Sequence, residues 1–297
     1  MANTKAVAVP SHQFKKKSQF KTIVVRYKKN KLAMVGLVML LVLIFFACTA
    51  NLFFDYKQDV IGQNIAQRLQ TPSAAHLLGT DQYGRDMLAR IVFGSRISLI
   101  VGLVTIAIGL SFGSLIGAVA GYYGGRIDNV LMRLMDVFLA IPSMLLAVCI
   151  VAALGGGLFN LLIASGVSQI ARFSRIVRSS IITMKGEQFI EAAKACGTKD
   201  SRIILHHILP NAMGPIIVQA TLNMAQAILV VSSLSFVGLG ITPPTPEWGS
   251  MLSTGKEMMR FYPHLVISPG VAIVLAVMAL NLIGDGLRDA LDPRLKN

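Results

Sequence analysis

A polar segment at residues 187–210 carries the side chains best suited to binding another protein. Glu191, Ala192 and Ala193 are predicted to begin a short helix whose small side chains permit close approach to a partner surface. Gly197 is predicted to end that helix in a turn, because glycine adopts backbone angles closed to other residues. On spacing alone, an ordinary solvated loop between helices is favoured. The charged side chains that could pair with a partner are Glu187, Lys194, Lys199 and Arg202.

No pattern typical of catalysis accompanies this segment. A nucleotide-binding P-loop needs Gly-x-x-x-x-Gly-Lys-[Ser/Thr], and the nearest string, from Gly249 to Glu257, has the wrong spacing and the wrong last residue. Adjacent residues on a helix point about 100° apart, so His206 and His207 do not form a metal site by themselves. We therefore expect no enzyme activity, no bound cofactor and no metal site in this chain.

The rest of the chain consists mainly of apolar runs of membrane-spanning length. Hydrophobic residues make up 54% of the 297 residues and charged residues only 14%, and one spanning helix needs about 20 apolar residues. The run at 137–171 is uncharged but too long for one span, and three glycines at 155–157 offer a turn in its middle. Six spans in an all-α integral membrane protein are predicted, the other four being residues 32–54, 97–123, 211–237 and 265–283.

The distribution of basic residues predicts the orientation of these spans. Lys and Arg concentrate in cytoplasmic segments, and placing both termini inside puts most of the 28 Lys and Arg residues there. The net charge of +14 then reflects topology and contact with anionic lipid, not nucleic-acid binding. Phe20, Ile23, Val24 and Tyr27 lie at helical spacing among basic residues, which predicts an amphipathic helix on the inner membrane face. For residues 1–17 a disordered basic tail is an equal alternative.

Four glycines recur at every fourth position of the second predicted span: Gly109, Gly113, Gly117 and Gly121. Small residues at this spacing let another helix backbone approach closely in a membrane. The stripe predicts packing within the chain or, as the alternative, an interface with a second membrane subunit.

The loop before the second span pairs acidic and basic residues. Asp81 with Arg85, and Asp86 with Arg90, are acid-to-base pairs at i,i+4, and Thr80 or Asp81 is placed to cap a helix. The loop is therefore predicted to fold back as a short helix that leads into the second span.

Five strings along the chain closely resemble the C-type permease subunit of dipeptide and oligopeptide ABC importers. They are GTDQYGRD at 79–86, GYYGG at 121–125, EAAKACG at 191–197, PPTPEWG at 243–249 and NLIGDGLRDALDP at 281–293. The resemblance implies the type I ABC importer permease fold, with six transmembrane helices and both termini in the cytoplasm. It also implies a multi-pass protein of the bacterial plasma (inner) membrane.

In that family, residues corresponding to 187–210 form a coupling loop that sits in a groove on an ATP-hydrolysing subunit. The resemblance therefore reverses the preference for a simple solvated loop. It implies these partners: a B-type permease forming a heterodimer with this chain, one or two ABC ATPase subunits that bind ATP and Mg, and an extracytoplasmic substrate-binding protein. The implied ATPase-coupling residues are Glu191, Ala192, Ala193, Lys194, Gly197 and Arg202.

A proline-rich segment at 243–246 excludes a continuous helix, so residues 238–262 are predicted to form an outer loop or a partly re-entrant segment. Trp248, the only tryptophan, suits the membrane–water interface. This segment is predicted to dock the binding protein or to shape an outer gate. The alternative is an anchored loop that makes no contact with a partner. The predicted extracytoplasmic contact residues are Asp81, Arg85, Asp86 and Trp248.

Polar residues in two spans are candidates for lining the translocation path. Gln219, Asn223 and Gln226 fall on one helical face, and such a stripe should turn inward because amides facing lipid are costly. Interhelical hydrogen bonding without a water-filled path is an equal alternative. The other candidates, on the fourth predicted span, are Ser165, Ser168 and Gln169.

Four regions follow from these patterns. They are a basic cytoplasmic tail with an amphipathic helix at 1–31, the first span and an extracytoplasmic loop at 32–96, a five-helix permease core with the coupling loop 187–210 at 97–286, and a cytoplasmic tail at 287–297. Import of nickel or metal chelates by the same machinery is the alternative to peptides. A secondary transporter is the alternative from another functional class. It would need charged residues at membrane depth for ion coupling, and the few candidates are Asp128, Asp136 and Asp285.

Overall fold

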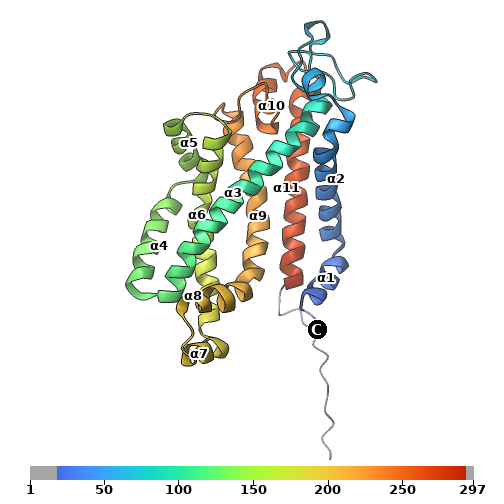
Figure 1. Cartoon of the computed structure of the whole chain (residues 1–297). Helices are drawn as coiled ribbons and strands as arrows, with labels where there is room; N and C mark the ends of the chain where they lie inside the picture. Colours follow the sequence, from blue (N-terminus) through green and yellow to red (C-terminus); the bar gives the residue numbers. More distant parts are fainter. Residues whose placement is uncertain (1–18, 292–297) are drawn as a thin grey trace, which may run out of the picture.

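Long helices dominate the computed structural model, which describes residues 19–291 (Figure 1). The predicted tail at residues 1–18 and the end of the 281–293 string lie outside the described residues. The long helices are α2 (Lys31–Phe53), α3 (Met87–Tyr123), α6 (Leu158–Lys185), α9 (Leu209–Phe236) and α11 (His264–Leu291). The shorter α-helices are α1 (Gln19–Lys29), α4 (Gly125–Ala140), α5 (Ser143–Leu154), α7 (Gln188–Ala195), α8 (Asp200–Arg202) and α10 (Trp248–Gly255).

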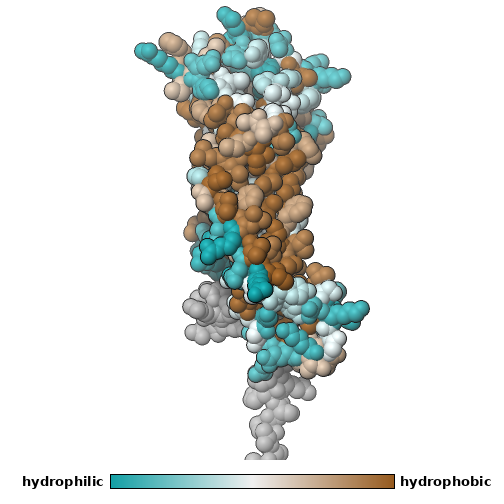
Figure 2. Space-filling view, turned by 90° about the vertical axis from the view of Figure 1, so that its left-hand side faces the viewer, coloured by the Kyte–Doolittle hydropathy of each residue, from teal (hydrophilic) through white to brown (hydrophobic). Residues whose placement is uncertain are grey.

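The long helices run side by side between the two ends of the molecule (Figure 1). One end carries residues 54–86 together with α10, and we call it the loop end. The opposite end carries α7 and α8, and we call it the α7 end. A hydrophobic belt separates these two ends in the space-filling view (Figure 2). The arrangement is that of a multi-pass membrane protein.

Within residues 19–291, four helices are long and apolar enough to cross a membrane: Lys31–Phe53, Met87–Tyr123, Asp200–Phe236 and His264–Leu291. The third of these joins α8, the π-helix Ile203–Ile208 and α9 without a break. A fifth crossing is present if the bent pair α4 and α5 counts as one span. α6 carries Arg172, Arg175 and Arg178, so its composition alone does not mark it as a span.

The third predicted span is not one straight helix, which corrects the sequence prediction. α4 and α5 meet at an angle of 88°. The break lies at Ile141 and Pro142, both of which have extended ψ values, 125° and 131°. Proline disfavours helical geometry at the residue before it and cannot continue a helix hydrogen-bond ladder. The predicted turn at the three glycines is confirmed, with φ of 88° at Gly155 and 122° at Gly157.

The glycine stripe of α3 packs against α6 of the same chain, which confirms the intrachain alternative. A Cβ added at Gly113 would lie 2.6 Å from Phe173 Cβ and 2.8 Å from the Ile170 carbonyl oxygen. A Cβ added at Gly109 would lie 2.6 Å from Gln169 Cβ. The two backbones therefore approach too closely for any residue larger than glycine, the geometry by which membrane helices associate through van der Waals contact.

Candidate coupling site

The predicted short helix is present as α7, which projects from the bundle at the α7 end (Figure 1). It ends where Gly197 takes a φ of +71°. The Thr198 amide donates to the Ala193 carbonyl and the Gly197 amide to the Lys194 carbonyl, at 3.1 and 2.9 Å. These are the backbone bonds of a glycine-terminated helix. The sequence prediction of a helix ended by Gly197 is therefore confirmed.

Most of the predicted coupling residues lie on the exposed surface of this projection. Ala193 is half-buried, and the five exposed ones are Glu191, Ala192, Lys194, Gly197 and Arg202. Phe189 is also exposed, at 43%, and lies three residues before Ala192 on the same side of α7. Sequence reasoning missed Phe189. An apolar aromatic residue inside a polar segment was the available signal, because aromatic side chains are common anchors in protein interfaces.

The inner side of α7 is anchored in the bundle. Ile190 is fully buried in a cluster with Ile203, Ile208 and Ile181, which belong to the π-helix and α6. Burying one such side chain stabilises the packing by about 1.5–3 kcal/mol. This apolar cluster therefore attaches α7 to the spanning helices. We call the cluster of Ile181, Ile190, Ile203 and Ile208 the joint.

Tyr122, at the end of α3, is the polar part of the same joint. Its hydroxyl donates to Asp200 Oδ1 at 2.6 Å, and its carbonyl oxygen accepts from Lys185 Nζ at 2.6 Å. The ammonium groups of Lys185 and Lys194 lie 5.6 and 5.4 Å from the centroid of its ring, within reach of cation–π attraction. One side chain thus contacts residues of α6, α7 and α8. Sequence reasoning included Tyr122 only in a resemblance string and assigned it no role.

The joint is continuous with two long elements. α8, the π-helix and α9 form one helix from Asp200 to Phe236, and Pro210 lies in the first turn of α9, where its missing amide is tolerated. α6 enters the joint through Ile181 and is packed along α3 through the glycine stripe. α7 is therefore in direct contact with elements that continue into α9 and the α3–α6 pair.

The predicted polar stripe on α9 divides between two environments. Asn223 is 2% exposed, and its Oδ1 accepts from Arg172 of α6 at 3.3 Å and from Gln219 at 3.4 Å. Gln226 is exposed, so it does not share the buried environment of Asn223. Among the other candidates, Ser168, Ser165 and Gln169 are buried in α6, and the Ser168 hydroxyl donates to the Ser165 carbonyl at 2.7 Å. The contact between Arg172 and Asn223 fits the interhelical alternative, whereas the Ser168 hydrogen bond lies within α6.

Comparison with known proteins decides the family. Residues 113–297 match the family described as binding-protein-dependent transport system inner membrane component, and residues 18–72 match the N-terminal TM domain of oligopeptide transport permease C. The chain belongs to this transport family. It is a membrane permease subunit of a binding-protein-dependent transport system.

The named relatives of this permease subunit match it over nearly its whole length. The dipeptide transport system permease protein DppC of Alkalihalophilus pseudofirmus is 48% identical over 97% of this chain and 94% of the relative. The di/tripeptide permease protein DppC of Pseudomonas aeruginosa is 42% identical over 91% of both chains. The oligopeptide permease protein OppC of Bacillus subtilis is 37% identical over 94% of this chain and 91% of the relative.

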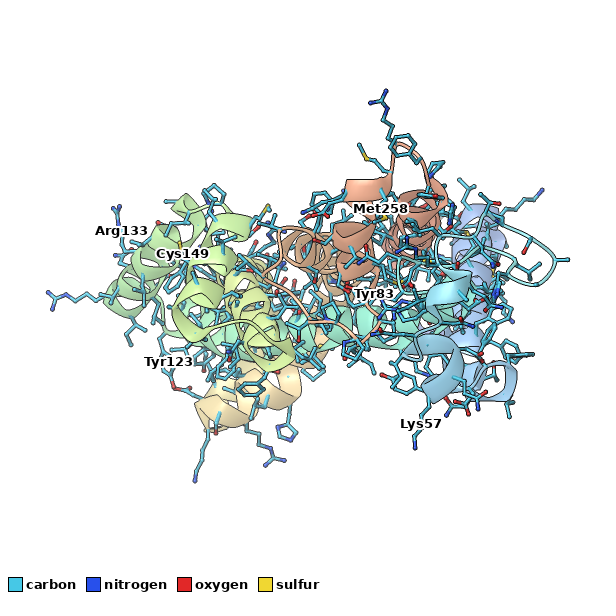
Figure 3. The ribbon with its side chains drawn as sticks, turned by 90° about the horizontal axis from the view of Figure 1, so that it is seen from above. Lys57, Tyr83, Tyr123, Arg133, Cys149 and Met258 are labelled. Atoms are coloured by element: carbon cyan, nitrogen blue, oxygen red, sulfur yellow. The ribbon has the colours of Figure 1, made fainter. Side chains whose placement is uncertain are left out.

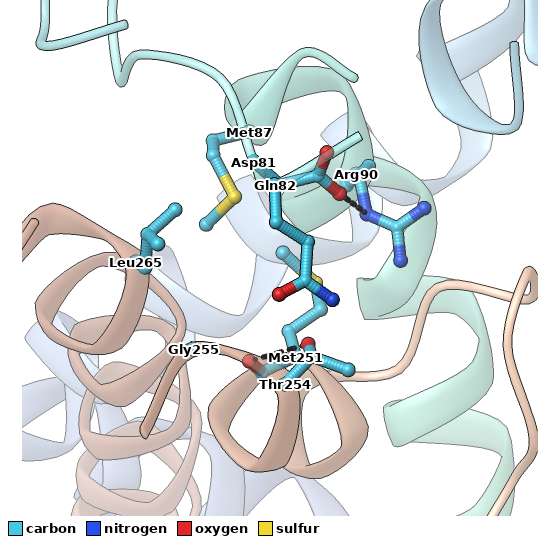
Figure 4. Close-up of a pocket in the computed structure, with 8 residues that line it drawn as sticks. All are labelled: Asp81, Gln82, Met87, Arg90, Met251, Thr254, Gly255 and Leu265. Atoms are coloured by element: carbon cyan, nitrogen blue, oxygen red, sulfur yellow. Dashed lines mark hydrogen bonds and ion pairs between the residues drawn. The ribbon is translucent and has the colours of Figure 1, made fainter. Parts of the chain in front are cut away.

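The loop end of the permease holds Asp81 and its partners in an irregular turn. Arg85 Nε donates to Asp81 Oδ2 at 2.6 Å, and Arg90 Nε lies 3.6 Å from the same oxygen (Figure 4). Asp86 caps α3 by accepting from the Ala89 amide at 2.9 Å. The predicted helix cap at Thr80 or Asp81 is therefore wrong, because α3 begins after Asp86.

The predicted pair between Asp86 and Arg90 is also wrong. The carboxylate of Asp86 serves the helix cap and lies 2.8 Å from His76 Nδ1. Arg90 turns instead to Asp81 and to the carbonyl oxygen of Val60. Asp81 and Arg85 are buried at 8% and 3% exposure, so these charges mainly hold the loop to the start of α3.

Trp248 lies in the interior of the loop end. It is fully buried, and its Nε1 donates to the Ile91 carbonyl at 3.0 Å. Glu247 caps α10 by accepting from the Gly249 and Ser250 amides, both at 2.8 Å. Burial raises the pKa of the Glu247 carboxyl above its usual value, and these two amides oppose the rise. Full burial leaves the Trp248 side chain no exposed surface for the predicted extracytoplasmic contact.

Proposed function

We propose that this permease subunit forms half of the translocation path of an ATP-driven importer of dipeptides or oligopeptides. The observation that carries the proposal is the 48% identity, along nearly the full chain, to a protein named as a dipeptide permease. Two further relatives with peptide-transport names support the same substrate class.

The coupling mechanism that we propose uses α7 as the docking element for an ATPase subunit. Glu191, Lys194 and Arg202 supply exposed charges, and Phe189 supplies an apolar anchor. ATP and Mg bind to the partner, and this chain contributes no catalytic, cofactor or metal residue. When ATP draws two ATPase subunits together, α7 moves as a rigid body and displaces α9 and the α3–α6 pair through Ile190 and Tyr122.

The proposed topology has six crossings, made by α2, α3, the bent α4–α5 pair, α6, α9 and α11, with both termini and the α7 end in the cytoplasm. The concentration of Lys and Arg in α1 and α6 supports this orientation. The location is the bacterial plasma membrane. The partners are a B-type permease subunit, one or two ABC ATPase subunits and an extracytoplasmic binding protein. In this orientation the loop end meets the binding protein.

A labelling experiment tests the topology. In a variant that keeps Cys196 as its only cysteine, a membrane-impermeant thiol reagent should react only after the cells are permeabilised. In a cysteine-free variant with Ser73→Cys, the same reagent should react with intact cells. Both positions are exposed, so access depends on the side of the membrane. Labelling of Cys196 in intact cells would overturn the orientation and the docking role of α7.

An uptake experiment tests the substrate. The gene for this chain should restore uptake of a radiolabelled dipeptide to cells from which only that gene has been deleted, and Gly197→Pro should not restore it. Proline fixes φ near −65° and cannot adopt the +71° found at this position. Immunoblotting of membranes would show that both proteins are present. Restoration of nickel uptake without dipeptide uptake would refute peptide import in favour of a metal chelate.

A further inference from the structure

A cleft of about 520 Å³ lies between α4 and α6, away from the coupling joint and the amide stripe. In Figure 2 the side of the molecule that carries α4 and α5 faces the viewer, and hydrophilic side chains interrupt the hydrophobic belt there. The residues that line the cleft are Asp128, Asn129, Met132, Arg133, Asp136, Arg175 and Arg178. Five of the seven carry a formal charge within helices of the permease.

Two ion pairs cross the cleft from α4 to α6. Arg178 donates two hydrogen bonds to Asp128, at 2.5 and 2.6 Å, and these side chains are 34% and 14% exposed. Arg175 donates to Asp136 at 2.5 Å, and these side chains are 55% and 46% exposed. Asp136 lies eight residues after Asp128, about 12 Å further along the axis of α4. The charges therefore extend from the first turn of α4 well into the belt.

α4 turns a different face toward lipid. Its exposed apolar side chains Ile127, Val130, Leu134 and Val137 recur at helical spacing on the side opposite Asp128 and Asp136. Charged side chains are costly in lipid and mark cavities or transport paths when they occur in spanning helices. The cleft is therefore the water-facing side of α4, and half-exposed Arg175 and Asp136 are its accessible charges.

The cleft contains one arginine that is not part of either ion pair. It contains three arginines and two aspartates, and Arg133 makes no hydrogen bond or ion pair with any residue from 19 to 291. Figure 3, which looks along the bundle, places Arg133 at the outer margin on the α4 side. A planar guanidinium is suited to binding a carboxylate through two parallel hydrogen bonds.

We propose that the α4–α6 cleft binds the charged ends of the transported peptide, with Arg133 and Arg175 holding its carboxylate and Asp136 its ammonium group. This inference rests on the proposed peptide substrate. Arg175 and Asp136 exchange their mutual ion pair for two pairs with the substrate, so neither charge is left unpaired. Arg133 and Asp136 lie at i,i+3, with Cβ atoms about 5–6 Å apart, and an extended dipeptide spans about 7 Å. Such a site recognises the charged ends of a peptide and does not distinguish its side chains.

Uptake by the reconstituted transporter, with all its partner subunits, tests this inference. Arg133→Gln should lower kcat/KM for dialanine about tenfold relative to the parent, and leave kcat/KM for dialanine amide, which lacks the carboxylate, unchanged. Asp136→Asn should lower kcat/KM for dialanine but not for N-acetyl-dialanine. The same binding protein delivers each peptide, so its preference cancels in the ratio of variant to parent. The matched control is Arg126→Gln, an exposed arginine of α4 that does not line the cleft.

Equal effects of Arg133→Gln on the free and the amidated peptide, or no effect on either, would overturn the cleft assignment. Absence of dialanine uptake by the parent transporter would instead refute the proposed substrate, so the two failures are distinguishable. A readout that does not depend on transport is thiol labelling of Met132→Cys in a cysteine-free permease. Dialanine should slow this labelling at least twofold, whereas Val137→Cys, on the lipid face, should label poorly with or without peptide. Unprotected Met132→Cys would also overturn the assignment.

Discussion

Among its neighbours, α6 contacts α3 and α4 in opposite ways. Against α3 it packs backbone to backbone along Gly109, Gly113, Gly117 and Gly121, with no room for a methyl group. Against α4 it makes ion pairs across a cleft of about 520 Å³. Close van der Waals packing fixes two helices as one body, whereas half-exposed ion pairs can exchange partners. We therefore expect the α3–α6 pair to be the rigid part of this permease and α4 the movable part.

The ends of α4 agree with this distinction. Gly124 and Gly125 connect it to α3 with φ values of 67° and 55°, and a Cβ added at either would meet no atom within 4 Å. Pro142 breaks the chain between α4 and α5. Of all the residues of α4, only Met135 is buried. α4 can therefore change its angle to α6 without repacking a core.

The largest expected effect is at the rigid interface. Gly113→Ala places a methyl group 2.6 Å from Phe173 Cβ and 2.8 Å from a backbone oxygen, so it should destabilise the permease by about 1–3 kcal/mol. The measurement is thermal unfolding of the purified protein in detergent. The control is Gly214→Ala in α9, where the added Cβ finds its nearest neighbour at 3.7 Å. Equal unfolding midpoints for the two variants would mean that α3 and α6 are not tightly packed.

An intermediate effect is expected where the rigid pair meets α7. Tyr122→Phe removes the hydroxyl that donates to Asp200 and keeps the ring between the two lysines. Loss of one such hydrogen bond is worth about 1 kcal/mol, so the transport rate should fall about fivefold while the subunits still assemble. Tyr123→Phe, at an exposed neighbouring position, should transport normally. Normal transport by Tyr122→Phe would remove this residue from the coupling route.

The smallest expected effect on stability is at the movable interface. Asp136→Asn breaks a half-exposed ion pair, and such pairs contribute about 0–1 kcal/mol. Its unfolding midpoint should stay close to that of the parent, although its peptide uptake falls. Asp128→Asn should cost more, because that carboxylate is only 14% exposed and accepts two hydrogen bonds. A loss of stability for Asp136→Asn as large as for Gly113→Ala would erase the difference between the two interfaces.

Sequence patterns of short range predicted the rigid part of the molecule well. Four helices, α2, α3, α9 and α11, lie where apolar runs predicted spans, at 32–54, 97–123, 211–237 and 265–283. Most ends agree to within a few residues. The exceptions are the start of α3 at Met87 and the end of α11 at Leu291. The glycine stripe predicted close helix packing, because its spacing alone fixes one face of a helix. Gly197 predicted the end of α7 from its backbone freedom.

Contacts between distant residues could not be predicted in the same way. The pairing of Asp128 with Arg178 joins positions 50 residues apart, and nothing in either local pattern specifies the other. Of the two predicted i,i+4 pairs at 81–90, Asp81–Arg85 is present. The second is absent because Asp86 caps α3 and approaches His76, and Arg90 lies near Asp81 instead. The burial of Trp248 likewise depends on its contact with Ile91 of α3, far away in sequence. The partners of the charged residues therefore depend on contacts between segments that are distant in the sequence.

One pair of distance measurements tests the proposed coupling most directly, because a displacement that α7 imposes on the α3–α6 pair should move that pair as one body relative to α4. Spin labels at Ile182 of α6 and Tyr123 of α3 report on the rigid interface, and labels at Ile182 and Val130 of α4 on the movable one. All three positions are exposed. In the assembled transporter, ATP should shift the α4–α6 distance distribution and leave the α3–α6 distribution unchanged. A shift between α3 and α6, or no shift between α4 and α6, would contradict the account.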